Sequence, residues 1–154
     1  MRRDRGMRAV TSSAEETMRL AAQLAKGLVP GDLVLVQGEL GVGKTTLIRG
    51  ACRALGVRGP IPSPTFTIGQ LLPGEGVEIA HLDLYRLEAL GRDELAVLDD
   101  YLTPERIAFV EWPEVAEHAG VLPQPTLRLV LRHAGGDRRE VAVEELAKVA
   151  AEGM

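Results

Sequence analysis

The amino-acid sequence predicts an α/β protein of one domain, in which helices and a central mixed β-sheet form a three-layer sandwich. Three observations support this prediction. A glycine-rich stretch at residues 38–46 stands between a strand-like and a helix-like segment. Several apolar runs of strand-like length follow it. The last two runs flank Gly135-Gly136, which favours an antiparallel hairpin and therefore a sheet that is not purely parallel. The 154 residues suit a single domain with a substantial core.

The first element expected along the chain is an amphipathic helix that begins at one of two serines. Ser12 with Glu15, or Ser13 with Glu16, would complete a capping box at its start. Apolar residues then recur at helical spacing and give the helix one face to bury, namely Met18, Ala21, Ala22, Leu24, Ala25 and Leu28. Pro30-Gly31 is expected to end this helix before the next strand.

The glycine-rich stretch is a phosphate-binding motif. Gly38-Glu39-Leu40-Gly41-Val42-Gly43-Lys44-Thr45-Thr46 matches the P-loop pattern G-x-x-x-x-G-K-[ST] at every fixed position. The apolar run 32–37 before it is predicted to be a buried strand, and residues 45–55 are predicted to be a helix that stops at Gly56. Because a P-loop requires this context, a chance match is disfavoured. The expected fold is therefore a P-loop NTPase-like three-layer sandwich with a central mixed β-sheet.

This motif predicts a bound nucleoside triphosphate. Its glycines let successive backbone N–H groups point at phosphate oxygens, at the positive end of the following helix. Lys44 is expected to reach the β- and γ-phosphates, and the Thr45 hydroxyl is expected to ligate Mg²⁺. The residues expected to contact the nucleotide here are Glu39, Leu40, Gly41, Val42, Gly43, Lys44, Thr45 and Thr46. Since the sequence has no Asn-Lys-x-Asp guanine-reading motif, ATP is favoured over GTP.

The segments after the P-loop helix alternate between loops, strands and one short helix. A loop rich in proline and glycine is expected at 57–64. The further expected elements are strands at 65–70, 77–85 and 106–111, a turn at 73–76, a helix at 92–98, and a hairpin of 126–132 and 139–143. We expect the hairpin to add antiparallel strands at an edge of the sheet.

Two carboxylates that end apolar strands are candidates for the metal site. Asp83 follows the apolar run 79–82, and Glu111 follows the run 107–110. In P-loop proteins the second acidic group usually ends a strand beside the P-loop strand. We expect one carboxylate to ligate Mg²⁺ directly or through water and the other to polarise the attacking water. The sequence leaves open which has which role, so Lys44, Asp83 and Glu111 are the expected catalytic residues.

Two other side chains could serve the same site. Thr65 lies in the loop after the P-loop helix, where a threonine can sense the γ-phosphate through Mg²⁺, although it could equally begin a strand. Trp112 follows Glu111 directly, so it could cover the nucleotide or serve packing alone. The histidines have no metal-ligand spacing and are interpreted as structural or exposed, namely His81, His118 and His133.

Composition excludes several other classes of protein. The net charge of −4 and the lack of a long basic run disfavour a protein that holds RNA by itself. The single cysteine, Cys52, excludes an internal disulfide and is expected to be a buried packing residue. No stretch resembles a signal peptide or a membrane span, so we expect a cytoplasmic protein. Residues 1–6 precede a possible second start at Met7 and are expected to be disordered.

Four blocks of residues together resemble the TsaE (YjeE) family, the small bacterial ATPases of tRNA threonylcarbamoyladenosine synthesis. The P-loop belongs to a vast superfamily, so the other three blocks carry the specificity. These are Ser63-Pro64-Thr65-Phe66-Thr67, His81-Leu82-Asp83-Leu84-Tyr85-Arg86-Leu87 and Val110-Glu111-Trp112-Pro113-Glu114. The resemblance covers about residues 11–132. The tail after Gly135 matches weakly, and no role is carried over to it.

The resemblance implies a specific function. Family members bind ATP and Mg²⁺, hydrolyse ATP poorly alone and associate with TsaB and TsaD, which transfer a threonylcarbamoyl group to the adenosine next to the anticodon in tRNAs that read codons beginning with A. The chain would then meet tRNA only through that complex, and its ATPase would reset the complex between turnovers. Carried over by motif, Thr65 is the switch-like threonine, Asp83 and Glu111 are the metal or water acids, and Trp112 lies near the nucleotide.

Two other functions stay open at this point. A small-molecule kinase would transfer the γ-phosphate to a metabolite, but such enzymes usually carry an arginine-rich lid, and here the arginines are scattered at Arg86, Arg92 and Arg106. An ATP-dependent binding module would use the nucleotide only to shape a docking surface, without turnover.

Overall fold

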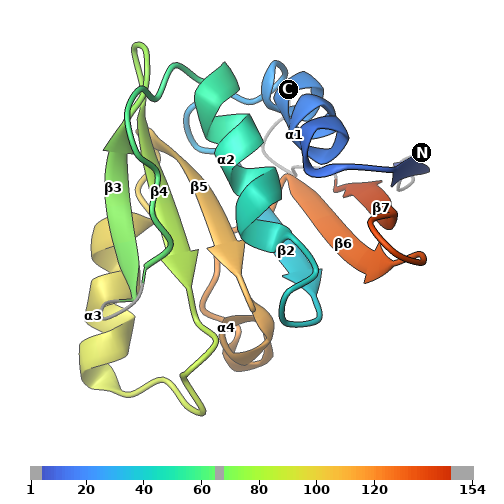
Figure 1. Cartoon of the computed structure of the whole chain (residues 1–154). Coiled ribbons are helices and arrows are strands. Elements are labelled where there is room, and N and C mark those ends of the chain that lie inside the picture. The colour runs from blue at the N-terminus through green and yellow to red at the C-terminus, as the bar shows by residue number, and fades with distance from the viewer. Residues whose placement is uncertain (1–4, 65–67, 147–154) are drawn as a thin grey trace.

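A computed structural model of the chain describes residues 5–64 and 68–146 (Figure 1). Its elements in chain order are β1 (Arg5–Thr11), α1 (Ala14–Ala25), β2 (Leu33–Gly38), α2 (Lys44–Ala54), β3 (Gly69–Pro73), β4 (Glu78–Asp83), α3 (Arg92–Tyr101), β5 (Arg106–Glu111), α4 (Glu114–Ala119), β6 (Leu127–His133) and β7 (Arg139–Glu145). None of the helices in these two segments is long and apolar enough to cross a membrane.

One mixed sheet runs through the middle of the molecule. Within the described residues its strand order is β1-β7-β6-β2-β5-β4-β3. The P-loop strand β2 lies between β5 and β6 and is parallel to both, and β4 is parallel to β5. The remaining pairs, β1 with β7, β6 with β7 and β3 with β4, are antiparallel. The predicted mixed sheet is therefore confirmed.

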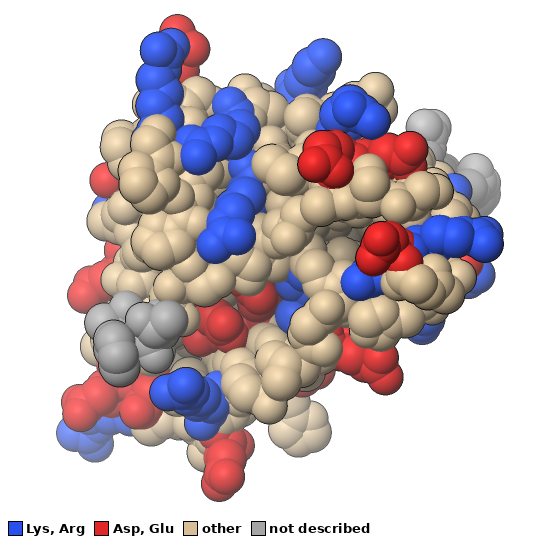
Figure 2. All heavy atoms as spheres, in the orientation of Figure 1, with Lys and Arg blue, Asp and Glu red and all other residues tan. Residues whose placement is uncertain are grey.

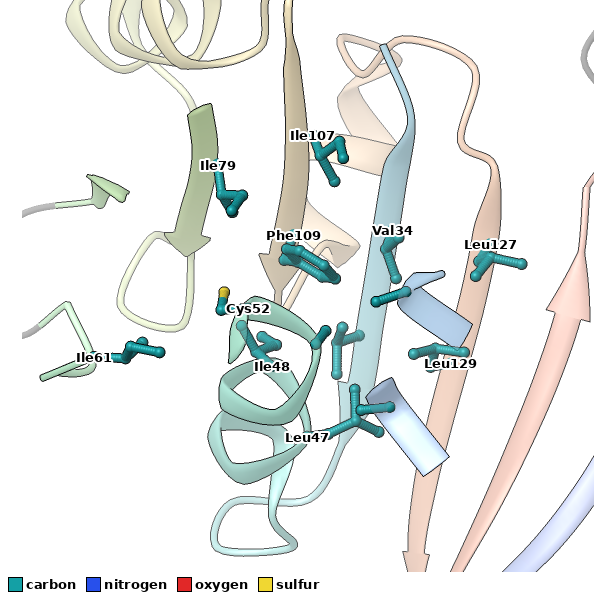
Figure 3. Packing of buried hydrophobic residues seen from close by; sticks show 14 of the residues in the cluster. Val34, Leu47, Ile48, Cys52, Ile61, Ile79, Ile107, Phe109, Leu127 and Leu129 are labelled. Atoms are coloured by element: carbon teal, nitrogen blue, oxygen red, sulfur yellow. The ribbon is translucent and has the colours of Figure 1, made fainter. Parts of the chain in front are cut away.

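Alternate residues of β2 face two separate cores, which gives the sandwich its three layers. Val34 and Val36 pack with residues of α1 and α2 in one cluster, whereas Leu33 and Leu35 pack with residues of α3 and α4 in the other. Figure 3 shows Leu47, Ile48 and Cys52 of α2 turned toward the strands in the first cluster. Such two-sided burial is typical of a central parallel strand and explains the continuous apolar run.

Cys52 has the packing role expected of it. Its side chain is fully buried between α2, to which it belongs, and the sheet, and burial raises the pKa of the thiol to about 12. A thiol with this pKa is not ionised near neutral pH and is a poor nucleophile.

The N-terminal part of the chain differs from the sequence-based expectation in two ways. Ser13 is the residue that caps α1, since its Oγ accepts from Glu16 N at 3.1 Å, and the helix ends at Ala25, well before Pro30-Gly31. A strand that was not expected, β1, precedes it. The expected disorder of residues 1–6 does not extend to Arg5 and Gly6, which pair with the last strand, while residues 1–4 lie outside the described part.

The C-terminal hairpin is present, but its place in the sheet differs from the expectation. Its first strand, β6, is an interior strand that runs parallel to β2, and β7 is covered by β1. The hairpin therefore does not form the edge. A hairpin signal in the sequence reports only the local pairing, whereas the neighbours on either side are set by contacts far away in the chain.

Several element bounds also shift. β3 begins at Gly69 and continues to Pro73, because it pairs antiparallel with residues 78–82 of β4. Pro73 is tolerated because β3 lies at the edge of the sheet. The expected strand positions 65–67 lie outside the described residues. β4 ends at Asp83, α3 extends to Tyr101, and the short helix α4 was not expected at all.

Candidate functional site

The P-loop leaves the carboxyl end of β2 and enters α2 at Lys44. Three of its glycines, Gly38, Gly41 and Gly43, have φ values of 151°, 78° and 109°. A Cβ atom on Gly38 would lie 2.7 Å from the carbonyl oxygen of Leu131. The tight path of this loop therefore depends on glycine, and it turns the backbone toward the N-terminus of α2, where N–H groups attract anions.

Lys44 is folded into this loop. Its Nζ donates to the carbonyl oxygens of Gly38 and Glu39 at 2.7 and 2.9 Å and lies 4.2 Å from the centroid of the Trp112 ring. Burial lowers the pKa of Lys44, and the nearby carboxylates of Glu111 and Asp83 oppose that shift. The ammonium group is thus held at the mouth of the P-loop, close to both candidate acids.

Asp83 and Glu111 lie side by side at the carboxyl edge of the sheet. They end β4 and β5, and their Cα atoms are paired across these strands. Thr45 Oγ1 donates to Glu111 Oε2 at 3.2 Å, so Glu111 contacts the predicted metal ligand directly. Asp83 is one strand further from the P-loop. Burial raises the pKa of Asp83, the N–H of Tyr85 opposes this shift, and the charge of Glu111 adds to it.

One pocket brings together most of the expected residues that the structure describes, although Glu39 and Val42 are not among those that line it. It has a volume of about 380 Å³ and lies between the P-loop and the ends of β4 and β5. Figure 2 shows acidic side chains within a hollow in this region of the surface. The lining residues are Leu40, Gly41, Gly43, Lys44, Thr45, Thr46, Ser63, Asp83, Tyr85, Glu111 and Trp112. Thr65 lies outside the described residues, so its switch role stays a prediction.

Trp112 covers this pocket in an unusual backbone conformation. Its φ of 54° makes it the sole non-glycine residue with positive φ in the described segments. A bulky residue in this region costs on the order of 1–3 kcal/mol and is found mainly at functional sites. The conformation places the indole over Lys44 Nζ and 4.8 Å from the Tyr85 ring. The aromatic pair therefore forms one wall of the pocket.

The residues around this pocket fit a magnesium ion held together with phosphate. Mg²⁺ prefers oxygen ligands and is commonly held by one or two carboxylates together with substrate phosphates. Thr45, Asp83 and Glu111 supply such oxygens from three different elements. In residues 5–64 and 68–146 there is no group of three or more His, Cys, Asp or Glu side chains that could hold a metal alone. The arrangement suits an ion that arrives with a nucleotide.

A second pocket lies on the other flank of the P-loop. Its volume is about 390 Å³, and its lining residues are Ser13, Ala14, Glu15, Thr17, Gly41, Val42, Gly43, Thr46, Asp137 and Arg139. It shares Gly41, Gly43 and Thr46 with the first pocket, so the two meet across the loop. Arg139 Nε donates to Val42 O at 2.9 Å and ties β7 to the P-loop.

Three site residues were missed or undervalued by sequence reasoning. Arg139 lies in the weakly matching tail, and no local pattern marks it. Ser63 Oγ donates to Thr45 Oγ1 at 3.2 Å, although only its place in the Pro-rich block hinted at a role. His81 was interpreted as structural or exposed. It is fully buried, and its Nε2 lies 2.7 Å from Glu111 Oε2. Strand alternation could have revealed it, because residues 81 and 83 share a face.

Comparison with known proteins gives consistent matches. A model of the family described as "Threonylcarbamoyl adenosine biosynthesis protein TsaE" matches residues 11–141. The "tRNA threonylcarbamoyladenosine biosynthesis protein TsaE" of Streptomyces coelicolor is 46% identical over 121 residues, which cover 77% of this chain and 80% of that protein. The protein of the same name from Bacillus subtilis is 37% identical over 131 residues, covering 85% and 80%. The crystal structure of YdiB from Bacillus subtilis has 31% identity and a TM-score of 0.76, covering 96% and 90%.

Proposed function

This chain belongs to the TsaE family, and from that premise we propose that it is an Mg²⁺-dependent ATPase that serves tRNA threonylcarbamoyladenosine synthesis. The observation that carries the ATPase proposal is the convergence of Lys44, Thr45, Asp83 and Glu111 on one pocket at the carboxyl edge of the sheet. Ligands of open α/β sheets bind at that edge.

We assign the two pockets to the two halves of the nucleotide. The triphosphate would lie along the P-loop, with the γ-phosphate in the pocket of Asp83 and Glu111. The ribose and base would extend into the pocket on the other flank, which Arg139 and Asp137 border. Mg²⁺ bound with the nucleotide would neutralise charge on the β- and γ-phosphates. ATP is preferred over GTP in this proposal because the chain has no guanine-reading motif.

The geometry supports different roles for the two carboxylates. Glu111 contacts the hydroxyl of Thr45 and ends the strand next to β2, so we assign it to the metal side of the site. Asp83 lines the same pocket from one strand further out, so we assign it to orienting and polarising the attacking water. Lys44 would hold the γ-phosphate and stabilise the charge that develops on its oxygens.

TsaB and TsaD are the proposed partners, and tRNA would be reached only through them. The net charge of −4 supports this division of labour, because a protein that binds RNA directly needs a strong basic surface. We propose that ATP hydrolysis resets the transferase complex between turnovers and that the transfer itself is performed by the partners.

The structure offers less support for the two alternatives. A kinase lid would need its arginines near the transferred phosphate. Arg106 instead begins β5, at the opposite end of that strand from Glu111, and binds Glu78. A binding module without turnover would not need two carboxylates beside the predicted phosphate position.

A product analysis separates these functions. The protein is incubated with γ-labelled ATP, TsaB, TsaD, substrate tRNA and a threonylcarbamoyl donor, and the label and the modified tRNA are both followed. Label in inorganic phosphate together with multiple rounds of tRNA modification supports the proposal. Label on a metabolite would favour the kinase, and repeated modification without any phosphate release would favour the binding module.

A further inference from the structure

We propose that His81 positions the carboxylate of Glu111 by donating to it from Nε2, and that Gln70 donates to the other ring nitrogen of His81, Nδ1. His81 acts through Glu111 and is a positioning residue. The effect on turnover rests on the ATPase function proposed above, whereas the tautomer of His81 is a property of the nucleotide-free protein and can be tested separately.

The contact between His81 and Glu111 lies in the interior of the protein. The side chain of His81 is 0% exposed and that of Glu111 is 4% exposed, and Nε2 lies 2.7 Å from Oε2. A buried carboxylate needs hydrogen-bond partners, because an unpaired one is costly to desolvate. His81 lies on β4 two residues before Asp83, on the sheet face that α2 covers. His81 therefore contacts Glu111 from the interior of the protein and does not line the pocket.

The contacts of Glu111 and Gln70 assign the same tautomer to His81. Gln70 Nε2 bonds the carbonyl oxygen of Pro62 and lies 3.3 Å from His81 Nδ1. A carbonyl oxygen can only accept, so Gln70 must present its NH₂ group to Pro62, and its second N–H is left for Nδ1. Since Nδ1 then accepts, the proton of the neutral ring is on Nε2 and points at Glu111.

The result is a ring of hydrogen bonds that connects the loop 57–64 to Thr45 and Glu111, two of the three predicted metal ligands. Ser63 donates to Thr45, Thr45 and His81 both donate to Glu111 Oε2, and Gln70 joins His81 to Pro62. Within the described residues, Glu111 Oε1 has only the long contact of 3.5 Å to Thr45 Oγ1. His81 thus fixes one oxygen of Glu111 and leaves the other for the metal or water. A displacement of this loop would therefore change the hydrogen bonds of Glu111 in two ways, through Ser63 and Thr45 and through Gln70 and His81.

The first test measures the tautomer in the nucleotide-free protein by long-range ¹H–¹⁵N correlation NMR of the histidine rings. His81→Gln assigns the signal by removing it. We expect a neutral ring with the proton on Nε2, and a shifted Nδ1 resonance in Gln70→Leu, because Nδ1 then loses its hydrogen-bond donor. Gln70 is half-buried, so that variant should fold. A proton on Nδ1 in the wild type, or an Nδ1 resonance that Gln70→Leu leaves unchanged, would overturn the proposal.

The second test separates turnover from nucleotide binding. Gln at position 81 can place an N–H near the position of Nε2, whereas Asn is too short to reach Glu111. His81→Asn should lower kcat by roughly 10- to 100-fold, as is usual for residues that orient metal ligands. Its Kd for ATP should stay within about two-fold of wild type, and His81→Gln should recover most of the rate. His118→Gln, an exposed change on α4, is the matched control.

Only variants whose circular dichroism spectrum matches that of the wild type are compared. Two outcomes of this second test contradict the proposal. Equal loss of kcat in His81→Asn and His81→Gln would indicate packing alone. A loss that appears in ATP affinity with kcat unchanged would place His81 in nucleotide binding. If the wild type itself shows no hydrolysis with TsaB and TsaD, the proposed ATPase function fails, and the NMR result still decides whether His81 is oriented as proposed.

Discussion

Asp83 is a site residue whose ionised form destabilises the folded, nucleotide-free protein. Burial raises the pKa of its carboxyl group in the nucleotide-free protein, so the folded state disfavours the ionised form that the proposed reaction uses. The folded state then binds more protons than the unfolded state between the two pKa values, and stability falls as the pH rises through that window. Above the raised pKa of Asp83 the nucleotide-free protein carries this cost in full.

Asp83→Asn should therefore stabilise the nucleotide-free protein and remove its ATPase activity. Asn keeps an oxygen that can accept from the N–H of Tyr85, while the charge is lost. We expect the melting temperature at about pH 7 to rise by about 2–4 °C for each kcal/mol of relieved cost. The difference between variant and wild type should disappear below the unfolded pKa of about 3.9. Thermal unfolding at both pH values checks this, and a variant that melts lower at neutral pH would contradict it.

Trp112 should report nucleotide binding through its fluorescence. It is the single tryptophan of the chain, and Lys44 Nζ lies against its ring in the nucleotide-free state. A γ-phosphate that draws the Lys44 ammonium toward itself will change the charge near the indole. We expect ATP with Mg²⁺ to produce a saturable change in emission that is absent in Lys44→Ala. An equal change in that variant would mean that the cation–π contact does not sense the phosphate.

Among the helices, α1 and α2 approach each other so closely that no side chain fits at Gly50 between them. A Cβ atom on Gly50 of α2 would lie 2.5 Å from the carbonyl oxygen of Met18 on α1. α2 is the P-loop helix, and together with α1 it forms the layer that packs on this face of the sheet. The glycine therefore serves helix packing, although glycine is a poor helix former.

Gly50→Ala should destabilise the protein even though alanine favours helix. The added methyl group must push backbone atoms apart, and overpacking of this kind costs about 1–3 kcal/mol. The gain in helix propensity is only about 1 kcal/mol. Gly27→Ala is the matched control, because the nearest atom to its added Cβ is 4.0 Å away. Urea unfolding checks the prediction, and equal midpoints for the two variants would contradict it.

The elements that sequence reasoning predicted well are those with strong local signals. The strand and helix around the P-loop and the strand β5 have long apolar runs or helical spacing with defined ends. By contrast, α4 spans 6 residues, too few for a helical period to show. β1 is a partly exposed edge strand whose partner lies at the far end of the chain. Such a strand is defined by pairing and not by its own sequence.

In the molecule as a whole, the sheet brings residues from the first helix and from the last described strand to the P-loop. Ser13 and Glu15 approach it from the start of α1, and Arg139 approaches it from β7. The sequence predicted the P-loop and the two strand-end acids, because each carries a local pattern. Arg139 and the partners of His81 could not be predicted in this way, since only the folded strand order places them at the site.

Arg139→Ala should weaken ATP binding from the flank opposite the carboxylates. Arg139 supports Val42 of the P-loop and lines the pocket proposed for the ribose and base. A hydrogen bond from a charged group contributes about 1.5–3 kcal/mol, so we expect the affinity to fall by about ten-fold or more. Arg138→Ala, a change in the exposed neighbour, should leave affinity unchanged. Calorimetric titration with ATP measures both, and equal affinities in the two variants would remove Arg139 from the nucleotide site.

We propose that this fold assembles an ATPase whose activity is used within the TsaB–TsaD complex. The most direct test is the steady-state rate of ATP hydrolysis by the purified protein with and without TsaB and TsaD, with Lys44→Ala as the blank. We expect a slow rate for the protein alone, a higher rate with both partners, and a rate at background for Lys44→Ala in either condition. A rate that the partners leave unchanged, or one that survives in Lys44→Ala, would contradict it.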